Sequence, residues 1–235
     1  MENFLQNLRN DLHSKKDETF QAISRRFFKE EIKCYGIRAS VITKMSKALS
    51  PQIKERPKKE IFALCEGLWK SGYLEETFFA ANWAYAIRKT FEPDDFKTFK
   101  RWIDNYIYNW ASCDSFCNHT MGAFIEMYPS FLKDLKKLAV SENRWTRRAA
   151  AVSLIIPAKK GLFLEDIFEI CNILLPDKDD MVQKGYGWLL KAASHKHPID
   201  VFDYVMSKKE TMPRTAFRYA IEKLPKDLRQ KAMGK

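Results

Sequence analysis

The sequence lacks the features that mark several common classes of enzyme. Its 235 residues include only 8 glycines, and none of them forms a glycine-rich loop of the kind that cradles the phosphates of a nucleotide cofactor. The GxSxG motif of serine hydrolases and the HExxH helix of zinc proteases are also missing. These absences disfavour folds that bind nucleotide cofactors, and they leave a pure interaction scaffold open.

Long apolar runs are missing as well. No stretch reaches the ~18 uncharged apolar residues that a membrane-spanning helix needs, and the opening segment MENFLQNLRNDLHSKKDE lacks the apolar centre of a signal peptide. The 5 cysteines are an odd number scattered through apolar stretches, which is typical of reduced core thiols and not of a disulfide framework. We therefore expect a soluble protein of a reducing cytoplasm.

Candidate metal ligands are sparse. Cys113, Cys117 and His119 lie close together in the sequence but lack a nearby fourth ligand. His195 and His197 form an isolated HKH in an expected loop. Neither group predicts a metal site.

Positive charge is what the sequence has in excess. It carries 41 lysines and arginines against 30 aspartates and glutamates, a formal net charge of +11. A protein of that charge attracts polyanions, in a manner that salt weakens. Nucleic acid is therefore the leading expected partner, with a merely solvated basic surface as the alternative.

Helical periodicity runs through almost the whole chain. Apolar residues recur at every third or fourth position in segments such as IFALCEGLWKSGYL and FLEDIFEICNILL, and no run alternates as a strand would. Prolines and glycines divide the chain into segments of roughly 10 to 18 residues, which predicts about a dozen helices joined by short loops. Hydrophobic residues make up 46% of the chain, enough for a packed core, and we expect a single domain over residues 1–235.

The expected helices form antiparallel pairs, because short loops reverse the direction of the chain. The pairs are 58–70 with 74–89, 95–108 with 110–128, 130–139 with 144–156 and 162–175 with 180–195. Successive pairs begin 32 to 37 residues apart in the sequence, close to the size of HEAT and armadillo repeats. The predicted fold class is all-α, a right-handed superhelical solenoid in which the second helix of each pair lines a concave, basic groove.

The tryptophans divide into two groups. Three of them lie at helical spacing among apolar residues and are expected in the core: Trp69, Trp83 and Trp102. Trp110 differs, because Asp114 follows it by one helical turn, and an aspartate beside an aromatic needs either solvent or a cationic partner. Trp188 is flanked on its helix face by Lys184 and Lys191. For Trp110 and Trp188 the pattern leaves core packing and a functional role equally open.

Arg148 presents a similar choice. It lies near the start of a strongly apolar helical segment, ENRWTRRAAAVSL. A charge in that position reaches either solvent or the groove, and composition leaves both open.

Five segments, taken together, resemble the AlkD-type DNA alkylation repair glycosylases. They are YGIRAS at 35–40, NWASCDSFC at 109–117, NRWTRRAA at 143–150, VQKGYGWLLK at 182–191 and MPRTAFRYAIEKLP at 212–225. Their order, their spacing and the all-helical context carry the resemblance, which extends over nearly the whole chain.

The resemblance implies a HEAT-like solenoid whose concave, basic groove holds duplex DNA. The activity it implies is base excision repair of purines alkylated at ring nitrogens, such as 3-methyladenine and 7-methylguanine, by cleavage of the N-glycosidic bond. The damaged base stays exposed against the duplex, so no tight base-shaped pocket is expected. Water is the second substrate, so no metal or organic cofactor is implied.

The resemblance also implies the site residues. The family's catalytic aspartate matches Asp114, and its two groove tryptophans match Trp110 and Trp188. The arginine associated with the catalytic site and the DNA backbone matches Arg148. Further contacts to DNA are expected from Phe27, Arg38, Arg147, Lys184 and Lys191.

The central motif departs from the commonest version in the family, which has two adjacent tryptophans followed by an acidic residue. Here Asn109 stands in place of the first tryptophan and Ala111 in place of the acid. The chain therefore resembles a divergent branch of the family.

Two other functions stay open beside the glycosylase. One is a catalytically silent solenoid that binds DNA through the same groove, and the other is a scaffold whose concave surface binds peptides or protein domains. For the glycosylase we expect a monomer without an obligate protein partner. We expect it to act on double-stranded DNA containing alkylated bases, in the cytoplasm of a bacterium, associated with the nucleoid when acting.

Overall fold

The computed structural model describes residues 2–234. In this part of the chain the regular elements are helices, and Lys33 and Tyr73 form an isolated β-bridge. The predicted all-α class is confirmed. The chain divides into two compact units, Met1–Phe116 and Cys117–Lys235, and the single domain expected over residues 1–235 stays a prediction. None of the described helices is long and apolar enough to cross a membrane.

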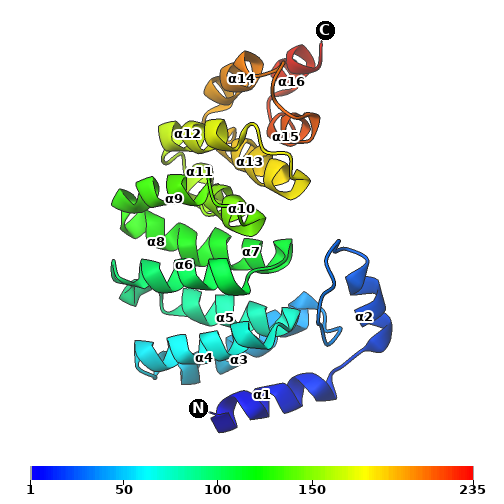
Figure 1. The fold of residues 1–235 in the computed structure, drawn as a ribbon, viewed down its shortest axis with the longest axis vertical. Helices are drawn as coiled ribbons and strands as arrows, with labels where there is room; N and C mark the ends of the chain where they lie inside the picture. Colours follow the sequence, from blue (N-terminus) through cyan, green and yellow to red (C-terminus); the bar gives the residue numbers. More distant parts are fainter. Residues whose placement is uncertain (1, 235) are drawn as a thin grey trace. The chain divides into compact units, whose positions relative to one another are not determined.

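The first unit stacks its helices in two layers. Its elements are α1 (Glu2–Ser14), α2 (Glu18–Arg25), α3 (Ala39–Lys54), α4 (Lys58–Ser71), α5 (Leu74–Ala86), the 3₁₀ turn η1 (Arg88–Thr90), α6 (Asp95–Tyr106) and α7 (Trp110–Phe116). Helix α4 packs against α1 and α6, while α5 packs against α3 and α7 (Figure 1). One layer therefore consists of α1, α4 and α6, and the other of α3, α5 and α7.

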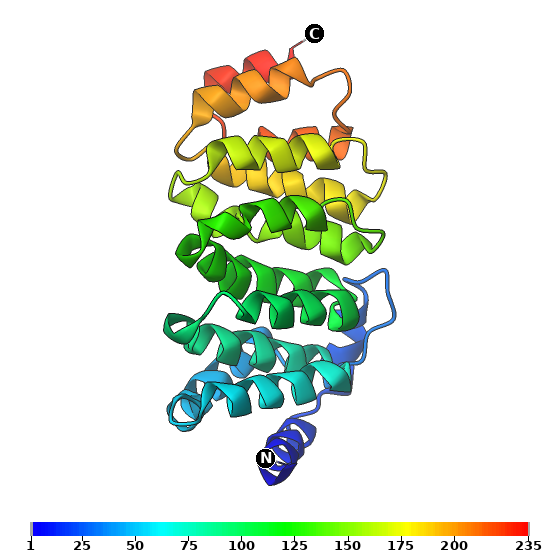
Figure 2. The same ribbon diagram turned by 60° about the vertical axis from the view of Figure 1, so that its left-hand side comes forward.

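The second unit repeats this arrangement. Its elements are the π-helical turn η2 (Cys117–Met121), α8 (Gly122–Met127), the 3₁₀ turn η3 (Pro129–Phe131), α9 (Leu132–Leu138), α10 (Arg144–Val152), α11 (Ile155–Lys159), α12 (Leu164–Leu174), α13 (Asp180–Ala193), α14 (Pro198–Ser207), α15 (Arg214–Ala220) and α16 (Lys226–Met233). Helix α9 packs on α12, while α10, α13 and α15 pack in succession. Figure 2 shows α9, α12 and α14 following one another along one side of this unit.

The predicted helix pairs are confirmed, with two differences. The segments 58–70 and 74–89 correspond to α4 and α5, and the segments 162–175 and 180–195 correspond to α12 and α13. The second helix of each remaining pair is interrupted, by the π turn η2 and by the break between α10 and α11. Pro157 explains that break, because it has no N–H to donate to the carbonyl of Ser153. These interruptions raise the number of α-helices within residues 2–234 to 16, above the dozen predicted.

The three tryptophans expected in the core are buried there, at 1% exposed or less. The Trp69 and Trp102 ring centroids are 6.4 Å apart, and Phe116 meets the two indoles at 5.6 and 5.8 Å. The five cysteines are free thiols and all are buried, as expected of core residues. Burial raises the pKa of the Cys65 and Cys171 thiols well above the ordinary value.

A buried carboxylate at the start of α5 organises the segment before α3. Glu75 is 2% exposed and accepts hydrogen bonds from the backbone N–H groups of Tyr35, at 3.0 Å, and Ile37, at 3.0 Å. The N–H of Gly36 donates to the same carboxylate at 2.9 Å. Gly36 has a left-handed φ of +83°, and a Cβ there would lie 2.1 Å from the carbonyl oxygen of Asp17. Only glycine fits this turn.

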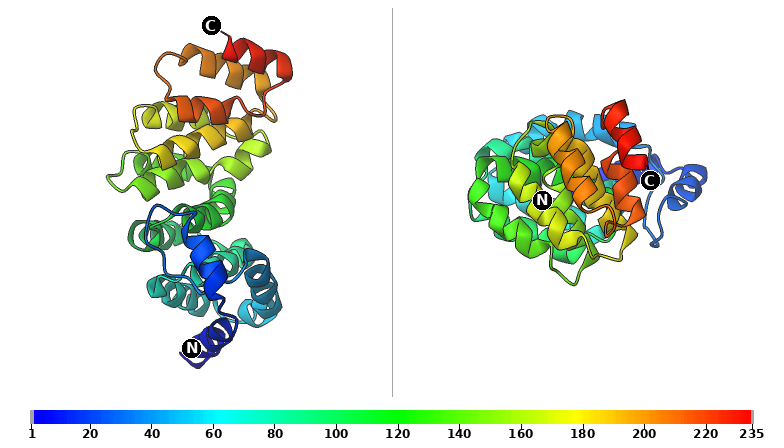
Figure 3. Two further views of the ribbon diagram at one scale, coloured as in Figure 1. Left: turned by 90° about the vertical axis from the view of Figure 1, so that its right-hand side faces the viewer. Right: turned by 90° about the horizontal axis from the view of Figure 1, so that it is seen from above.

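The next residue of α5 holds the N-terminal helix. Glu76 is 1% exposed and accepts hydrogen bonds from Arg9 of α1, through Nε at 3.2 Å and Nη2 at 3.1 Å. The hydroxyl of Tyr35 donates to the other oxygen of Glu76 at 2.8 Å, and the pKa of Tyr35 is raised by burial and by this carboxylate. Helix α2 lies in the sequence between Arg9, which Glu76 holds, and the turn at residues 35–37, which Glu75 holds. It begins at its N-cap Asp17 and has no buried residue. Figure 3 shows α2 at the side of the first unit, outside both layers.

Substitution of Glu75 by alanine should destabilise the first unit strongly. The change leaves three buried N–H groups without an acceptor, and we expect a loss of about 3 kcal/mol or more in the free energy of unfolding. Urea denaturation followed by circular dichroism measures this loss. Glu31→Ala is the control, because Glu31 is exposed, and it should stay within ~0.5 kcal/mol of wild type. Equal stability of both variants would refute the anchoring role of Glu75.

Candidate functional site

All predicted site residues that fall within the helix pairs lie on the second helix of a pair. Trp110 and Asp114 belong to α7, in the layer of α3 and α5. The others belong to α10 and α13, which pack on each other in the second unit: Arg147, Arg148, Lys184, Trp188 and Lys191. Apart from Phe27, which follows α2, each unit therefore carries its candidate residues on one layer.

Trp110 is anchored by the segment that follows α2. Its indole Nε1 donates to the carbonyl of Phe27 at 3.2 Å, and its ring stacks on Phe28 with centroids 5.2 Å apart and planes at 16°. Trp110 is only half-buried, packed against a small apolar cluster of Ile32, Cys34, Leu74 and Ala111. The indole is thus held in a fixed orientation with part of its surface exposed. It combines the packing of a core residue with the accessibility of a functional one, the two alternatives that the sequence left open.

The residues that depart from the family's commonest motif have structural roles here. Asn109 is fully buried, and its Oδ1 accepts from the N–H of Ser112 at 2.9 Å, which satisfies a free donor in the first turn of α7. The Ser112 hydroxyl lies 2.9 Å from that of Thr77 on α5. Ala111 is 6% exposed inside the apolar cluster, where an acidic side chain would lack a partner.

Asp114 lies one turn after Trp110 in α7 and is half-buried. Residues four apart on a helix share a face, so the carboxylate and the indole lie on the same side of α7. The residues around Asp114 on the other faces of α7 are buried, with Cys113 and Phe116 at 0% exposed. Packing of the rest of the helix therefore fixes where the carboxylate lies.

Two expected DNA contacts in the first unit are accessible. Phe27 is 69% exposed, although its carbonyl is bonded to Trp110. Arg38 is the N-cap of α3, directly after the turn held by Glu75, and its exposed guanidinium lies 5.1 Å from the centroid of the Phe20 ring. Both side chains can reach a ligand without rearrangement of the core.

Arg148 is buried, at 4% exposed, so the alternative of a surface charge is excluded. Its Nη1 donates to the carbonyl of Met181 in α13. The absence of a side chain at Gly185 makes room for it, because a Cβ there would lie 3.3 Å from Arg148 Cγ and 3.4 Å from Nη1. Arg148 therefore joins α10 to the first turns of α13.

Arg147, the neighbouring residue, is engaged on the protein. Its Nε pairs with Asp177 at 2.6 Å, and its Nη1 donates to the carbonyls of Ser141 and Glu142 at 2.9 and 2.8 Å. The expected contact of Arg147 with DNA stays a prediction. Such a contact requires the guanidinium to share its N–H donors between these protein acceptors and the DNA.

The two lysines that flank Trp188 are also paired. Lys184 contacts Asp180 at 3.0 Å, and Lys191 contacts Glu222 at 3.0 Å and lies over the ring of Tyr219. The hydrogen bond from Lys191 lowers the pKa of the Glu222 carboxyl. Trp188 itself is half-buried, and among the described residues its indole has no hydrogen bond or ring contact. Its surface is therefore available to a ligand.

Sequence reasoning missed the acidic residues that hold this framework. Glu75 and Glu76 are adjacent acids at the start of an apolar helix, and Asp177 lies in the PDKDD loop before α13, with its side chain 8% exposed. Acids ahead of a helix usually indicate capping or solvent exposure. Their burial could have been suspected only from the apolar residues around them. No group of three or more potential metal ligands is found among residues 2–234.

The two glycines of the KGYGW segment are not equivalent, and this is testable. A Cβ at Gly187 would lie 2.8 Å from the backbone oxygen of Ala216 and 2.8 Å from Tyr219 Cβ, so α15 must move to accept it. A Cβ at Gly185 meets only the Arg148 side chain. Alanine raises helix propensity by about 1 kcal/mol at either position, and overpacking costs about 1 to 3 kcal/mol at a rigid one.

We therefore expect Gly187→Ala to lower the free energy of unfolding and to do so more than Gly185→Ala, measured by urea denaturation. Because both substitutions lie on α13 and change the same atoms, Gly185→Ala is a matched control. A Gly187→Ala variant as stable as wild type would show that α13 and α15 are not closely packed at this point.

A solved structure from Enterococcus faecalis, described as a predicted DNA alkylation repair enzyme, aligns with a TM-score of 0.80 over 90% of this chain and 98% of its own. The two sequences are 20% identical, so this likeness concerns the fold. No curated protein matches the chain. The sequence model of the family described as DNA alkylation repair enzyme matches residues 8–224, and the chain belongs to that family.

Proposed function

We propose that this member of the family is a monofunctional DNA glycosylase that removes alkylated, positively charged purines from duplex DNA. The observation that carries the proposal is the arrangement on α7, where the Asp114 carboxylate and the anchored Trp110 indole share one face. Membership of the DNA alkylation repair family supports DNA as the substrate, and the formal net charge of +11 is consistent with a polyanionic ligand.

The chemistry gives the carboxylate its role. Alkylation of a purine ring nitrogen makes the base a cationic leaving group, which departs as a neutral base when the N-glycosidic bond breaks and the sugar becomes oxocarbenium-like. A carboxylate about 4 Å from that charge contributes on the order of 4 kcal/mol at an effective dielectric near 20. Transition-state theory converts this energy to roughly a thousandfold in rate. Asp114 also orients the water that attacks the sugar and accepts its proton.

The aromatic and basic residues have a separate role in this proposal. The faces of Trp110 and Trp188 attract a cationic nucleotide by cation–π contact, worth about 0.5 to 2 kcal/mol, and favour the lesion over a neutral base. Arg38, Lys184 and Lys191 bring positive charge to the phosphate backbone without reading its sequence, and Arg148 adds its charge from a buried position on α10. Because water is the second substrate, the reaction needs no cofactor. We propose that the protein works as a monomer, in the bacterial cytoplasm at the nucleoid.

Asp114→Asn tests the catalytic role. We expect release of methylpurines from methylated duplex DNA to fall by roughly a thousandfold, because the variant loses the charge that stabilises the sugar cation. Its affinity for DNA should stay close to that of wild type. Liquid chromatography of released bases and fluorescence anisotropy of a labelled duplex give the two quantities.

The matched control is Asp203→Asn, since Asp203 is an exposed acid on α14, and its activity should equal that of wild type. Wild-type turnover in Asp114→Asn would refute the assigned role. If wild type binds duplex DNA but releases no base, the chain is a catalytically silent DNA-binding solenoid. Absence of duplex binding even at low salt would instead favour a protein-interaction scaffold.

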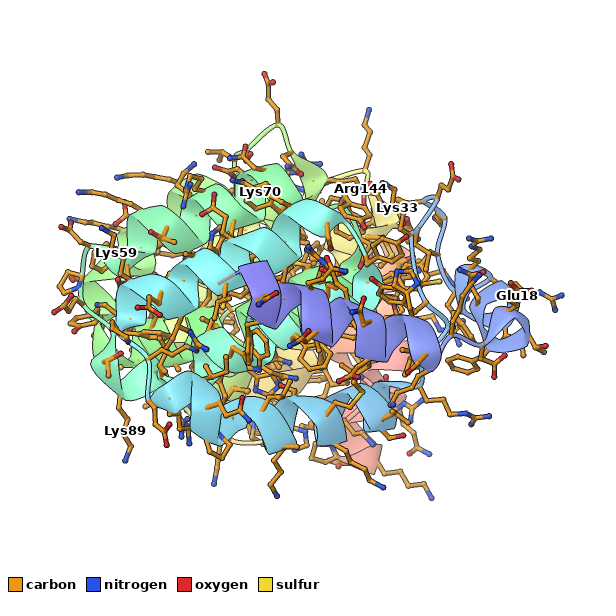
Figure 4. The ribbon with its side chains drawn as sticks, turned by 90° about the horizontal axis from the view of Figure 1, so that it is seen from below. Glu18, Lys33, Lys59, Lys70, Lys89 and Arg144 are labelled. Atoms are coloured by element: carbon orange, nitrogen blue, oxygen red, sulfur yellow. The ribbon has the colours of Figure 1, made fainter. Side chains whose placement is uncertain are left out.

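Salt dependence tests the proposed backbone contact of Arg38. The logarithm of the binding constant for unmodified duplex should fall linearly with the logarithm of salt concentration, and Arg38→Gln should reduce the slope by about 1. Anisotropy at several salt concentrations measures it. Lys59→Gln is the control, because Lys59 is an exposed cation of α4, in the other layer of the first unit, and points outward (Figure 4). A slope that falls equally in both variants would contradict a specific contact of Arg38.

A further inference from the structure

A small polar hollow lies between α3 and α5 in the first unit, apart from α7. Its volume is about 190 Å³. The residues that line it are Thr43, Ser46, Lys47 and Ser50 of α3 with Asn82 and Trp83 of α5. None of them was among the site residues predicted from the sequence.

Most of the polar groups in this hollow have no partner in the part of the chain that the structure describes. Ser46 is only 4% exposed, yet its hydroxyl forms no hydrogen bond with the described residues. Lys47 forms no ion pair and the Asn82 amide no hydrogen bond with that same part of the chain. Thr43 differs, since its hydroxyl donates to the carbonyl of Ala39 at 2.9 Å. The Ser46 hydroxyl is not among the buried polar atoms that lack a partner, so it keeps contact with solvent and a ligand in the hollow can reach it.

Trp83 also lines the hollow and is 0% exposed. Its indole Nε1 is buried and has no acceptor among the described residues. An indole N–H can only donate, so the group that would satisfy it must be an acceptor.

The charge of the lining selects the kind of acceptor. Hydroxyls, an amide and an indole N–H supply donors, Lys47 supplies a positive charge, and no aspartate or glutamate is among the lining residues. This combination favours an anion over a neutral or cationic ligand. A tetrahedral oxyanion can accept several hydrogen bonds at once, and the hollow has room for one.

We propose that the hollow between α3 and α5 binds a phosphate-type oxyanion, held by Lys47 and Ser46 above the indole of Trp83. Two sources share this chemistry: a phosphodiester of a DNA backbone, and free phosphate or a phosphomonoester. Helices α3 and α5 belong to the same layer as α7, which carries Trp110 and Asp114. The DNA source rests on the proposed function, whereas binding of free phosphate does not.

The test follows the indole N–H resonance of Trp83 in ¹⁵N-labelled protein, assigned by its loss in Trp83→Phe. Titration with inorganic phosphate should shift this resonance saturably, while sodium chloride of equal ionic strength should not. Lys47→Gln should weaken phosphate binding by about tenfold, because a charge-assisted hydrogen bond is lost. Lys44→Gln is the matched control, since Lys44 is an exposed lysine of α3 outside the hollow, and it should bind phosphate as wild type does.

A second arm adds an unmodified DNA duplex. If the duplex shifts the same resonance and competes with phosphate, the ligand is a backbone phosphodiester. If phosphate shifts it and the duplex does not compete, the ligand is free phosphate or a phosphomonoester. An unmoved Trp83 resonance in both arms, or an equal loss of affinity in Lys44→Gln and Lys47→Gln, overturns the proposal. Neither arm measures base release, so its failure is separable from failure of the glycosylase proposal.

Discussion

The buried carboxylate of Glu75 is the interaction on which the candidate site of the first unit depends. It receives the N–H groups of three consecutive residues, and Gly36 among them can adopt the left-handed turn this requires. Buried N–H groups need an acceptor, and one neutral side chain could not accept all three as strongly. The turn fixes where α3 begins, and so where Arg38 emerges. It also closes the segment whose Phe27 and Phe28 hold the indole of Trp110.

The second unit also depends on charged side chains that are bonded within the protein, but here they are arginines instead of a glutamate. Arg148 is buried against α13, where Gly185 leaves it space, and Arg147 is neutralised by Asp177 in the loop before that helix. Buried charges are costly unless they are paired or hydrogen-bonded. Contacts of this kind specify how α10 and α13 pack, beyond what apolar side chains alone would do. Gly187 then lets α15 approach the opposite side of α13. The two glycines of one short segment therefore allow close packing against both α10 and α15.

Electrostatics connects the framework to the proposed function. The net charge of +11 does not mean that every cation is available, because Lys184 and Lys191 are paired with Asp180 and Glu222. A phosphate backbone that binds at α13 competes with those carboxylates. Exposed ion pairs contribute little stability, about 0 to 1 kcal/mol, so such exchange is inexpensive. Arg38 and Lys47 carry no such partner within residues 2–234, and both lie on or beside α3.

The sequence by itself determined the helical class, the helix pairs and the second-helix location of the site residues. Apolar spacing along each helix is a local property, and prolines and glycines mark the helix ends. The burial of Trp69, Trp83 and Trp102 followed from the same pattern. The sequence placed a helix end directly before Pro157, whereas the break falls earlier, between α10 and α11, and Pro157 lies inside α11. The π turn within 110–128 was missed, because a helical pattern continues across it.

Only the tertiary structure decided which polar residues are buried and with whom they pair. Glu75 binds residues about 40 positions earlier, and Arg147 binds Asp177 across 30 positions. The same residue types in the same local patterns usually lie in solvent. Asn109 and Ala111, which depart from the family's commonest motif, proved to be a helix-capping residue and part of an apolar cluster. The physical reason is that a polar side chain acquires its partner from the packing of distant helices, which no local pattern encodes.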